Sequence, residues 1–341
     1  MHRRSFIRST TWFALSLATA KLLSSCSSNP QINSVAKNII DLDENIKELN
    51  FGIISTESQV NQRPFWDPLI QDLSDALKIP VNASYVTSYA AVIESMRFGK
   101  VHVAWFGGKS YIEAAKMANA EAFAQTLSDS GSPGYYAHLI TSKNNPIASK
   151  IKNGNGDRYV IENASDLTFA FNDPNSTSGF LVPSYYIFAK NNINPQQAFK
   201  QVIFSGSHEA NTLAVVNNQV DVATTNSEAL SRLEIINPEA REQIQIIWTS
   251  VKLPGEPIAY RKDLPEELKE KIRGFFYNYN DKVVLEKLNW SGFRAAEDRD
   301  WNSIRELEIG RQILEIENNE KMNQNQKDEK IKELQKQLEL L

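Results

Sequence analysis

The chain has 341 residues, of which 41% are apolar and 23% charged, with a formal net charge of −4 at pH 7. This composition is that of an ordinary globular protein that is long enough for two domains. The acidic balance and the lack of a basic tract argue against nucleic acid as a partner.

The N-terminal segment predicts an export signal of the Tat or Sec type. A twin arginine, Arg3-Arg4, precedes an apolar run over residues 11–20 that is too short to span a bilayer. The single cysteine, Cys26, directly follows the sequence Leu-Ser-Ser, and this pattern resembles the lipidation site of bacterial lipoproteins. We therefore expect residues 1–25 to be a signal peptide.

On this interpretation, Cys26 anchors the mature chain to a bacterial membrane, in the periplasm or elsewhere in the cell envelope. Residues 26–47 would form the lipid anchor and a polar tether. Removing residues 1–25 takes away four basic residues and no acidic one, which lowers the net charge from −4 to −8. The alternatives are cleavage after Ala20 with release of a soluble protein, or a free or buried thiol in an unprocessed leader.

The body of the chain alternates between strand-like and helix-like segments. In the first half, strands are predicted over residues 51–55, 81–86 and 101–106, and helices over residues 66–77, 89–98 and 110–117. In the second half, strands are predicted over residues 167–171, 201–204 and 220–224, and helices over residues 179–189 and 209–217. This alternation favours βαβ units and a mostly parallel sheet with both faces covered.

The two halves repeat one pattern, which predicts two α/β lobes. VHVAWFG at residues 101–107 and VDVATTN at residues 220–226 are analogous strands that end in polar or aromatic residues. Two extended runs, residues 135–140 and 244–251, could cross between the lobes. Ligands of such sheets bind beyond the carboxyl ends of the strands.

With these crossings, the first lobe would comprise residues 48–138 and 249–300, and the second lobe residues 139–248. After Pro265 the chain is expected to be helical. Apolar residues at three- and four-residue steps within residues 301–341 predict a helical tail. This tail either packs two helices on the body or serves as a partner helix.

One stretch, DPNSTSGF at residues 173–180, carries a candidate anion site. It lies between a predicted strand and a predicted helix, where the backbone N–H groups of the first turn lack partners within the helix. Ser176, Thr177 and Ser178 stand at this turn, and no Lys or Arg occurs over residues 163–189. An anion would therefore be held by hydroxyl and amide groups, although turn and N-cap roles are the alternative.

Five more residues could complete a ligand site. His208 falls between a strand and a helix and would be a second donor toward the hydroxyl groups. Tyr89 and Tyr135 adjoin turns, and a phenol combines an apolar wall with a hydrogen-bond donor. Glu228 and Glu256 could recognise a cation, because a buried ammonium group requires a paired carboxylate. An ordinary core or loop position is the alternative for each.

Signatures of enzymes are weak. Gly107-Gly108-Lys109-Ser110 imitates the end of a phosphate-binding P-loop, but the position five before Gly108 is Val103 and not glycine. No GxGxxG or GxSxG run occurs, and the four histidines are far apart in the sequence. We therefore expect no metal cluster, no catalytic triad and no cofactor.

Six stretches together resemble the phosphonate-binding proteins of ABC phosphonate importers: FGIISTESQ, SYAAVIESMRFGKVHVAWFG, GSPGYYAHLI, DLTFAFNDPNSTSGFLVP, SHEANTLAVVNNQVDVATTNSE and LPGEPIAYR. The resemblance extends from about Leu49 to the tail. It implies the type II periplasmic binding protein fold, with two α/β lobes joined by a two-strand hinge and with C-terminal helices. It also implies a small-molecule phosphonate ligand, an ABC transporter permease and its ATPase as partners, and no enzymatic activity.

The resemblance also assigns roles to the candidate residues. It implies that the phosphonate oxygens are bound by Ser176, Thr177, Ser178 and His208, with Tyr89 and Tyr135 lining that end. Glu228 stands where the family has a carboxylate for the amino group of 2-aminoethylphosphonate. Glu256 stands where enterobacterial relatives have Asp in a similar loop. Because the family's C-terminal helices can pair two subunits, a homodimer is possible.

The leading hypothesis is therefore a substrate-binding protein that captures 2-aminoethylphosphonate or a related alkylphosphonate for import. A receptor for phosphite, methylphosphonate or phosphate in the same importer class is the alternative, for which Glu228 and Glu256 would be incidental. A phosphonate-processing hydrolase that uses one of the hydroxyl groups is more remote. So is a surface adhesin or signalling protein that acts through its tail.

Overall fold

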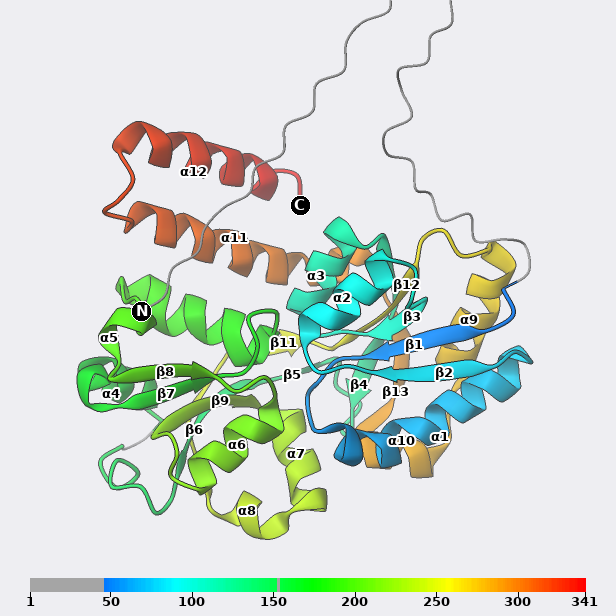
Figure 1. Ribbon diagram of the computed structural model, residues 1–341, viewed down its shortest axis with the longest axis horizontal. Coiled ribbons are helices and arrows are strands. Elements are labelled where there is room, and N and C mark those ends of the chain that lie inside the picture. The colour runs from blue at the N-terminus through cyan, green and yellow to red at the C-terminus, as the bar shows by residue number, and fades with distance from the viewer. Residues whose placement is uncertain (1–45, 152–153) are drawn as a thin grey trace, which may run out of the picture. The chain divides into compact units, whose positions relative to one another are not determined.

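The computed structural model describes residues 46–151 and 154–341, whose strands form two large sheets and one two-stranded sheet (Figure 1). The predicted signal peptide, Cys26 and the predicted tether up to residue 45 lie outside the described residues. Among the helices that are described, none is long and apolar enough to cross a bilayer.

The first lobe is built on a six-stranded sheet in the order β13-β4-β12-β3-β1-β2. Its strands are β1 (Leu49–Ile53), β2 (Val81–Tyr85), β3 (Val103–Trp105), β4 (Ala120–Ser128), β12 (Pro257–Arg261) and β13 (Trp290–Ala295). Its helices are α1 (Gln59–Leu77), α2 (Tyr89–Arg97), α3 (Gly108–Met117), α9 (Glu266–Asn278) and α10 (Lys282–Leu288). Because β1 lies between β2 and β3, right-handed crossovers leave α1 and α2 on opposite faces of the sheet.

Three tryptophans form the part of the first lobe's core that matters most for the site. Trp66 of α1 packs against Trp105 of β3 and Trp290 of β13, with ring centroids 4.9 and 5.5 Å apart. All three side chains are buried. This packing fixes the two strand indoles in place next to the edge of the sheet where a ligand is expected.

The second lobe is built on a five-stranded sheet in the order β10-β6-β9-β7-β8. Its strands are β6 (Ala137–Ser142), β7 (Thr168–Phe171), β8 (Gln201–Phe204), β9 (Val222–Asn226) and β10 (Ile244–Thr249). Its α-helices are α4 (Gly156–Glu162), α5 (Pro195–Ala198), α6 (His208–Val216), α7 (Ser227–Ile236) and α8 (Pro238–Glu242). The 3-10 segments η1 (Ala164–Asp166) and η4 (Ala189–Asn191) and the π-helical segments η2 (Thr177–Leu181) and η3 (Ser184–Phe188) complete it.

The repeated pattern expected from the sequence is confirmed. In the first lobe β1 lies between β2 and β3 and is parallel to both. In the second lobe β7 lies between β8 and β9 and is parallel to both. β3 and β9, which carry the two analogous sequences, therefore occupy equivalent positions in the two sheets.

The two extended runs lie side by side where the chain passes between the sheets. β5 (Gly134–Tyr135) pairs with β11 (Leu253–Pro254), and β6 pairs with β10, both in antiparallel fashion. β5 follows β4 of the first sheet, and β11 precedes β12 of the same sheet. The chain thus crosses to the second lobe and returns through one two-strand connection, while the exact lobe boundaries stay a prediction.

The expectation of a mostly parallel sheet was wrong, because both large sheets are mixed. β12 pairs antiparallel with β3 and β4, and β13 pairs antiparallel with β4. In the second sheet β6 pairs antiparallel with β9 and β10. The reason is the return crossing, which brings β12 into the first sheet from the other lobe rather than through a βαβ unit.

The expectation that the chain is helical after Pro265 was also wrong. β13 interrupts the helices and forms one edge of the first sheet. The alternation of apolar and polar residues that would reveal this strand is broken at Gly292, where the pairing register with β4 shifts. A sequence pattern of period two is therefore not visible there.

Residues 179–189, expected as one α-helix, instead form η2, η3 and the first residue of η4. Pro183 has no N–H to donate to the Gly179 carbonyl four residues earlier. That carbonyl instead accepts hydrogen bonds from Asn172 N at 3.1 Å and Thr224 Oγ1 at 2.8 Å. The wider turn thus ties η2 to β7 and β9.

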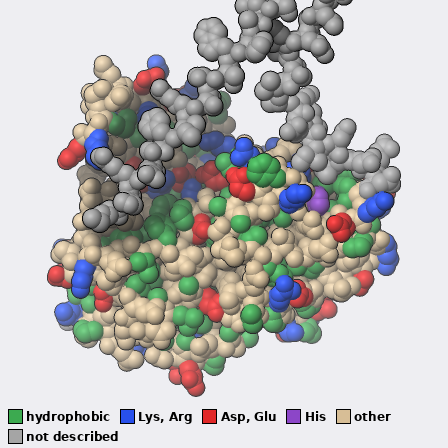
Figure 2. Space-filling view, in the orientation of Figure 1, with side chains coloured by type: hydrophobic (Ala, Val, Ile, Leu, Met, Phe, Trp, Pro, Cys, Tyr) green, Lys and Arg blue, Asp and Glu red, His purple; other side chains and the backbone are tan. Residues whose placement is uncertain are grey.

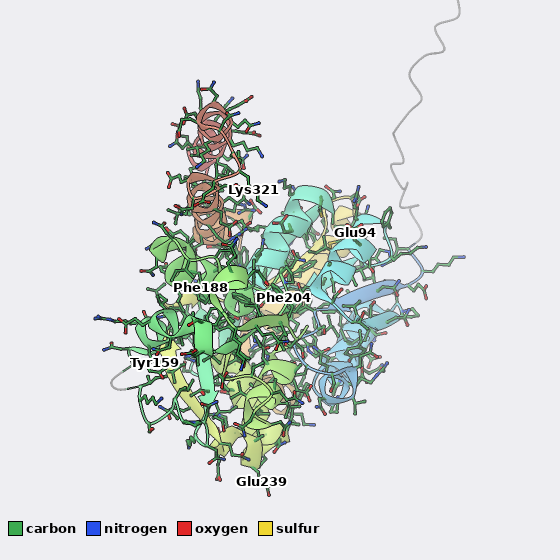
Figure 3. All side chains as sticks on the ribbon, turned by 60° about the vertical axis from the view of Figure 1, so that its left-hand side comes forward. Glu94, Tyr159, Phe188, Phe204, Glu239 and Lys321 are labelled. Atoms are coloured by element: carbon green, nitrogen blue, oxygen red, sulfur yellow. The ribbon has the colours of Figure 1, made fainter. Side chains whose placement is uncertain are left out.

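The tail follows η5 (Asp298–Trp301) and forms two helices, α11 (Asn302–Glu317) and α12 (Gln324–Leu338). α11 packs against α3, η2 and η3, whereas α12 packs against α11 and projects away from both sheets (Figures 1 and 3). On the face that Figure 2 shows, acidic and basic side chains are interspersed rather than grouped by sign.

Candidate ligand-binding site

The candidate site lies where parallel strands of both lobes end. α2 follows β2 and α3 follows β3 in the first lobe, while η2, α6 and α7 follow β7, β8 and β9 in the second lobe. Each of these segments begins with N–H groups that have no partner within their own helix. The topology therefore brings five such segment starts, from both lobes, to one region of the molecule.

The three hydroxyl groups at the start of η2, Ser176 at its N-cap and Thr177 and Ser178 in its first turn, are buried and no more than 3% exposed. Ser176 Oγ accepts a hydrogen bond from Gly179 N at 3.0 Å, and Thr177 Oγ1 accepts one from Lys109 N at 2.8 Å. Ser178 Oγ accepts one from Asn226 Nδ2 at 3.1 Å. Because each oxygen already accepts a hydrogen bond from an N–H group, its own proton is available for donation to a ligand. The N-cap interpretation thus applies to Ser176 alone and is compatible with ligand binding.

Glycines allow the backbone to approach these hydroxyl groups closely. A Cβ atom on Gly179 would lie 2.4 Å from Asn172 Cβ, which no packing arrangement allows. A Cβ atom on Gly107 would lie 3.3 Å from Thr177 Oγ1. The P-loop-like sequence therefore serves to bring the start of α3 against η2, and Lys109 Nζ instead forms ion pairs with Glu113 and Glu308 at 3.2 and 3.3 Å.

His208 is a neutral donor next to the hydroxyl groups. Its side chain is 1% exposed, and its Nε2 lies 3.2 Å from Asn226 Nδ2 and 3.5 Å from Ser178 Oγ. Burial and then the charge of Arg232 lower the pKa of His208 to about 3. The imidazole is therefore uncharged at neutral pH. Because Asn226 Nδ2 donates toward Nε2, the one N–H proton of the ring lies on Nδ1, which has no hydrogen-bond partner among the described residues.

Two buried tyrosines lie between the hydroxyl groups and the acidic residues. Tyr89 begins α2, and its backbone N donates a hydrogen bond to Asp173 Oδ2 at 3.3 Å. Burial and then the charge of Glu256 raise the pKa of Tyr89, and the same two causes raise the pKa of Tyr135. Both phenols stay protonated and can donate a hydrogen bond.

Glu228 and Glu256 form an acidic pair on the other side of the tyrosines. Both side chains are buried, and in each one the Oε2 atom has no hydrogen-bond partner among the described residues. Burial raises the pKa of both carboxyl groups, and for Glu256 the charge of Glu228 raises it further. The indole N–H groups of Trp290 and Trp105 lie beside Glu228 and Glu256 respectively and oppose this shift.

A second buried pair, Arg232 and Glu57, adjoins these acids and was not predicted from the sequence. Arg232 lies one turn after Glu228 on α7, and its Nε donates a hydrogen bond to Glu57 Oε1 at 2.7 Å across the lobes. Burial opposes the charged form of Arg232, but Glu57, Glu228 and Glu256 together raise its pKa. The cluster thus contains three carboxyl groups and one guanidinium group. Because acidic groups outnumber basic ones, a further cation would be stabilised there.

All eight residues predicted to bind ligand are buried, and they fall into a donor end and an acid end. The sequence interpretation missed two asparagines at the donor end, Asn172 and Asn226. Asn226 caps α7 through Ala229 N and also donates to Ser178. Asn172 directly follows β7 and Asn226 is the last residue of β9, and a polar residue at the carboxyl end of a strand is the signal that could have revealed them.

Among the residues that the structure describes, no group of three or more His, Cys, Asp or Glu side chains is arranged to hold a metal ion. Tyr135 and Glu228 also line an open pocket beside the two-strand connection. The pocket therefore reaches the acid end at Glu228, whose side chain is itself buried.

Two α/β lobes, a two-strand connection and a buried site between strand ends define a binding protein of the type II periplasmic class. A family model described as the periplasmic substrate-binding protein of phosphonate ABC transporters matches residues 51–301. The chain belongs to this family.

Individual relatives agree with this assignment. The phosphonates-binding periplasmic protein of Escherichia coli is 46% identical over 301 residues, which are 87% of this chain and 86% of that protein. A crystal structure of the binding component of a phosphonate ABC transporter from Pseudomonas aeruginosa is 44% identical, with a TM-score of 0.80 over 85% of this chain and 95% of that one. A Prochlorococcus marinus protein in complex with methylphosphonate has the same fold, with 24% identity and a TM-score of 0.68 over 77% of this chain and 97% of that one.

The chain is therefore a substrate-binding protein that binds a small phosphonate and works with the components of an ABC transporter. Its relatives are binding proteins and not enzymes.

Proposed function

We propose that the preferred ligand is an aminoalkylphosphonate, in particular 2-aminoethylphosphonate, and that the protein delivers it to the permease. The observation that carries this proposal is the pair of facing, buried carboxyl groups of Glu228 and Glu256, each with an oxygen atom that has no hydrogen-bond partner in the described part of the chain. An isolated buried carboxylate is costly, and a ligand ammonium group would offset that cost. A ligand without an amine would leave it uncompensated.

The donor end suits the phosphonate group. Ser176, Thr177 and Ser178 each have a proton to donate, since each oxygen already accepts a hydrogen bond from the protein. Neutral His208 would add a further donor, and Tyr89 and Tyr135 could donate from the side. Such a set matches an acceptor-only oxyanion and rejects groups that must donate.

The acid end suits an ammonium group. Arg232 is held by Glu57 and so offsets one of the three carboxyl charges, which leaves Glu228 and Glu256 as the acceptors for a ligand cation. One amino group with three N–H donors could bond to both. The ligand would thus lie between the lobes with its phosphonate in the second lobe and its amine at the junction of the lobes.

The deciding experiment is calorimetric titration with 2-aminoethylphosphonate and with methylphosphonate. We expect Glu228→Gln to weaken binding of the amine-bearing ligand by about 2–5 kcal/mol, the scale for truncation of a buried charge pair, and to leave methylphosphonate nearly unchanged. Glu234→Gln is the matched control, because Glu234 is exposed on the same helix.

Comparable affinities of the parent protein for the two ligands would refute the amine site. They would instead favour the receptor for methylphosphonate, phosphite or phosphate, as the methylphosphonate complex of the Prochlorococcus marinus protein suggests for that relative. Turnover of a phosphonate ester by the pure protein would favour the hydrolase.

We further propose that Cys26 is lipidated and holds the protein in the periplasm or cell envelope. The support is the leader pattern in the sequence, which lies outside the described residues. Mass spectrometry of the mature N-terminus tests this: a lipid-modified Cys26 is the expected result, and a chain that begins at Lys21 contradicts it.

The tail offers a second surface, and we propose that it pairs two subunits. Among the described elements, α12 packs extensively only against α11. Leu340, which lies just beyond the end of α12, is 77% exposed. Deletion of residues 315–341 should convert a dimer into a monomer in light scattering while ligand affinity is retained. A full-length protein that is already monomeric would contradict this proposal.

A further inference from the structure

One helix next to the site has no N-terminal cap of its own. Ser58, at the N-cap of α1, makes no capping hydrogen bond through its side chain, and the first turn of α1 contains no acidic residue. By contrast, α2, α6 and α7 are capped by the side chains of Ser88, Ser207 and Asn226. The start of α1 therefore depends on another part of the molecule for its hydrogen bonds and its compensating charge.

Glu209 of the second lobe supplies both. Its Oε2 accepts a hydrogen bond from Ser58 N at 2.6 Å, and its Oε1 accepts one from Asn61 Nδ2 at 2.5 Å. In return, the backbone N–H groups of His208 and Glu209 donate to Thr56 O at 3.0 and 3.2 Å. The starts of α1 and α6 thus satisfy each other across the two lobes, and we call this set of contacts the interlobe cap.

We propose that Glu209 is a positioning residue that holds the lobes together through the interlobe cap, and that it thereby scales the affinity for every ligand by the same factor. Glu209 is adjacent in sequence to His208, so the contacts that join the lobes also hold a ligand donor in place. None of the hydroxyl groups of η2 and neither Glu228 nor Glu256 takes part in the interlobe cap. The inference therefore goes beyond the identity of the ligand.

The physical basis is the equilibrium between joined and separated lobes. When the lobes separate, α1 loses its cap, and the carboxylate of Glu209 exchanges two charge-assisted hydrogen bonds for water. A ligand that enters between separated lobes is retained when the lobes join, so a change that favours separation lowers the apparent affinity for any ligand in proportion. The Glu57–Arg232 pair also bridges the lobes. Because it adjoins Glu228 at the acid end, a substitution in this pair would change lobe closure and ligand recognition together.

The test compares Glu209→Ala and Glu209→Gln with the exposed control Glu234→Ala in the full chain. Glu209 lines a pocket with Glu57 and Asn61, so water can fill the space that the smaller side chain leaves. From the range for charge-assisted hydrogen bonds we expect Glu209→Ala to weaken both 2-aminoethylphosphonate and methylphosphonate by about 10- to 100-fold. Glu209→Gln keeps an acceptor oxygen without the charge and should lose less.

Stopped-flow kinetics supplies the second measurement. The loss should appear as faster dissociation, with the same factor for both ligands, because the variant destabilises the joined state and the two ligands share the phosphonate group that His208 would contact. Unchanged affinity, a loss confined to one ligand, or a loss carried by slower association would each overturn the proposal. If neither phosphonate binds the parent protein, the proposed ligand is wrong. The affinity of Glu209→Ala relative to the parent protein is then measured with inorganic phosphate or phosphite.

Discussion

The two ends of the candidate site use different physical means. At the donor end the hydroxyl groups of Ser176, Thr177 and Ser178 are fixed by hydrogen bonds from nitrogen atoms, and the adjacent His208 is uncharged. At the acid end several buried ionisable groups lie together, and their pKa values depend on one another. Recognition at the donor end would therefore depend on the positions of neutral donors, whereas recognition at the acid end would depend on the balance of charges.

This difference predicts different responses to substitution. Removal of one neutral donor leaves the other donors in place, so its effect is moderate and does not depend on the remote end of the ligand. Removal of one charge at the acid end leaves its neighbours uncompensated in a buried setting, so its effect is large. The Glu228→Gln titration tests recognition at the acid end, and further variants separate the two ends more sharply.

The largest effect is expected for Arg232→Met. Without the guanidinium group, no cation of the described residues would offset the charges of Glu228 and Glu256. We expect the free energy of unfolding to fall by about 3–5 kcal/mol. The measurement is urea denaturation at pH 7. The double variant Arg232→Met/Glu57→Met should recover part of the loss, because it removes one carboxyl group as well. A single variant as stable as the parent would show that the acid end does not need this cation.

A smaller and unselective effect is expected for Ser178→Ala. The variant removes one donor to the phosphonate oxygens, and we expect binding of 2-aminoethylphosphonate and of methylphosphonate to weaken equally, by about 1.5–3 kcal/mol. Ser149→Ala is the control, because Ser149 is exposed in the same lobe. The affinity ratio of the two ligands should stay at its parent value. A change in that ratio would mean that the two ends of the site are not independent.

The same difference explains what the sequence could reveal. The donor end was predictable because Ser176, Thr177 and Ser178 are consecutive, and a strand-to-helix turn is a local signal. Glu228 and Glu256 were each predicted from the sequence as residues that could bind a cation, but the Arg232–Glu57 pair was missed. These two residues are 175 positions apart, and the helix that carries Arg232 was not predicted. A charge cluster that is assembled from both lobes has no local pattern to recognise.

The fold shows the same limit. The parallel strands β1, β2, β3 and β7, β8, β9 were predictable because each is separated from the next by a segment that forms one crossover. β4, β12 and β13 were not, since their order and direction follow from the passage of the chain to the second lobe and back. The roles of the eight candidate residues in ligand binding stay proposals.

The smallest effect, taken per pH unit, is expected in the pH dependence of stability, and here the two ends should act with opposite sign. The pKa of His208 is about 3 in the folded protein, so below pH 6.5 the unfolded chain binds a proton at this residue that the folded chain does not. The free energy of unfolding therefore decreases as the pH falls from 6.5 toward 3. The pKa values of Glu228 and Glu256 are raised by burial, so the folded state binds protons there more tightly than the unfolded chain does. Their contribution to the free energy of unfolding increases as the pH falls.

Urea denaturation of the parent, His208→Asn and Glu228→Gln between pH 7 and pH 5 separates the two contributions. Relative to the parent, His208→Asn should gain about 1.4 kcal/mol for each pH unit below 6.5, because it removes the buried group that resists protonation. Glu228→Gln should change in the opposite direction, since it removes a group that takes up a proton in the folded state. His138, whose pKa is lowered to about 4 by burial, is present in all three proteins and cancels in the comparison. If both variants followed the parent at every pH, neither end would titrate as its surroundings require, and the contrast between a neutral donor end and a charged acid end would fail.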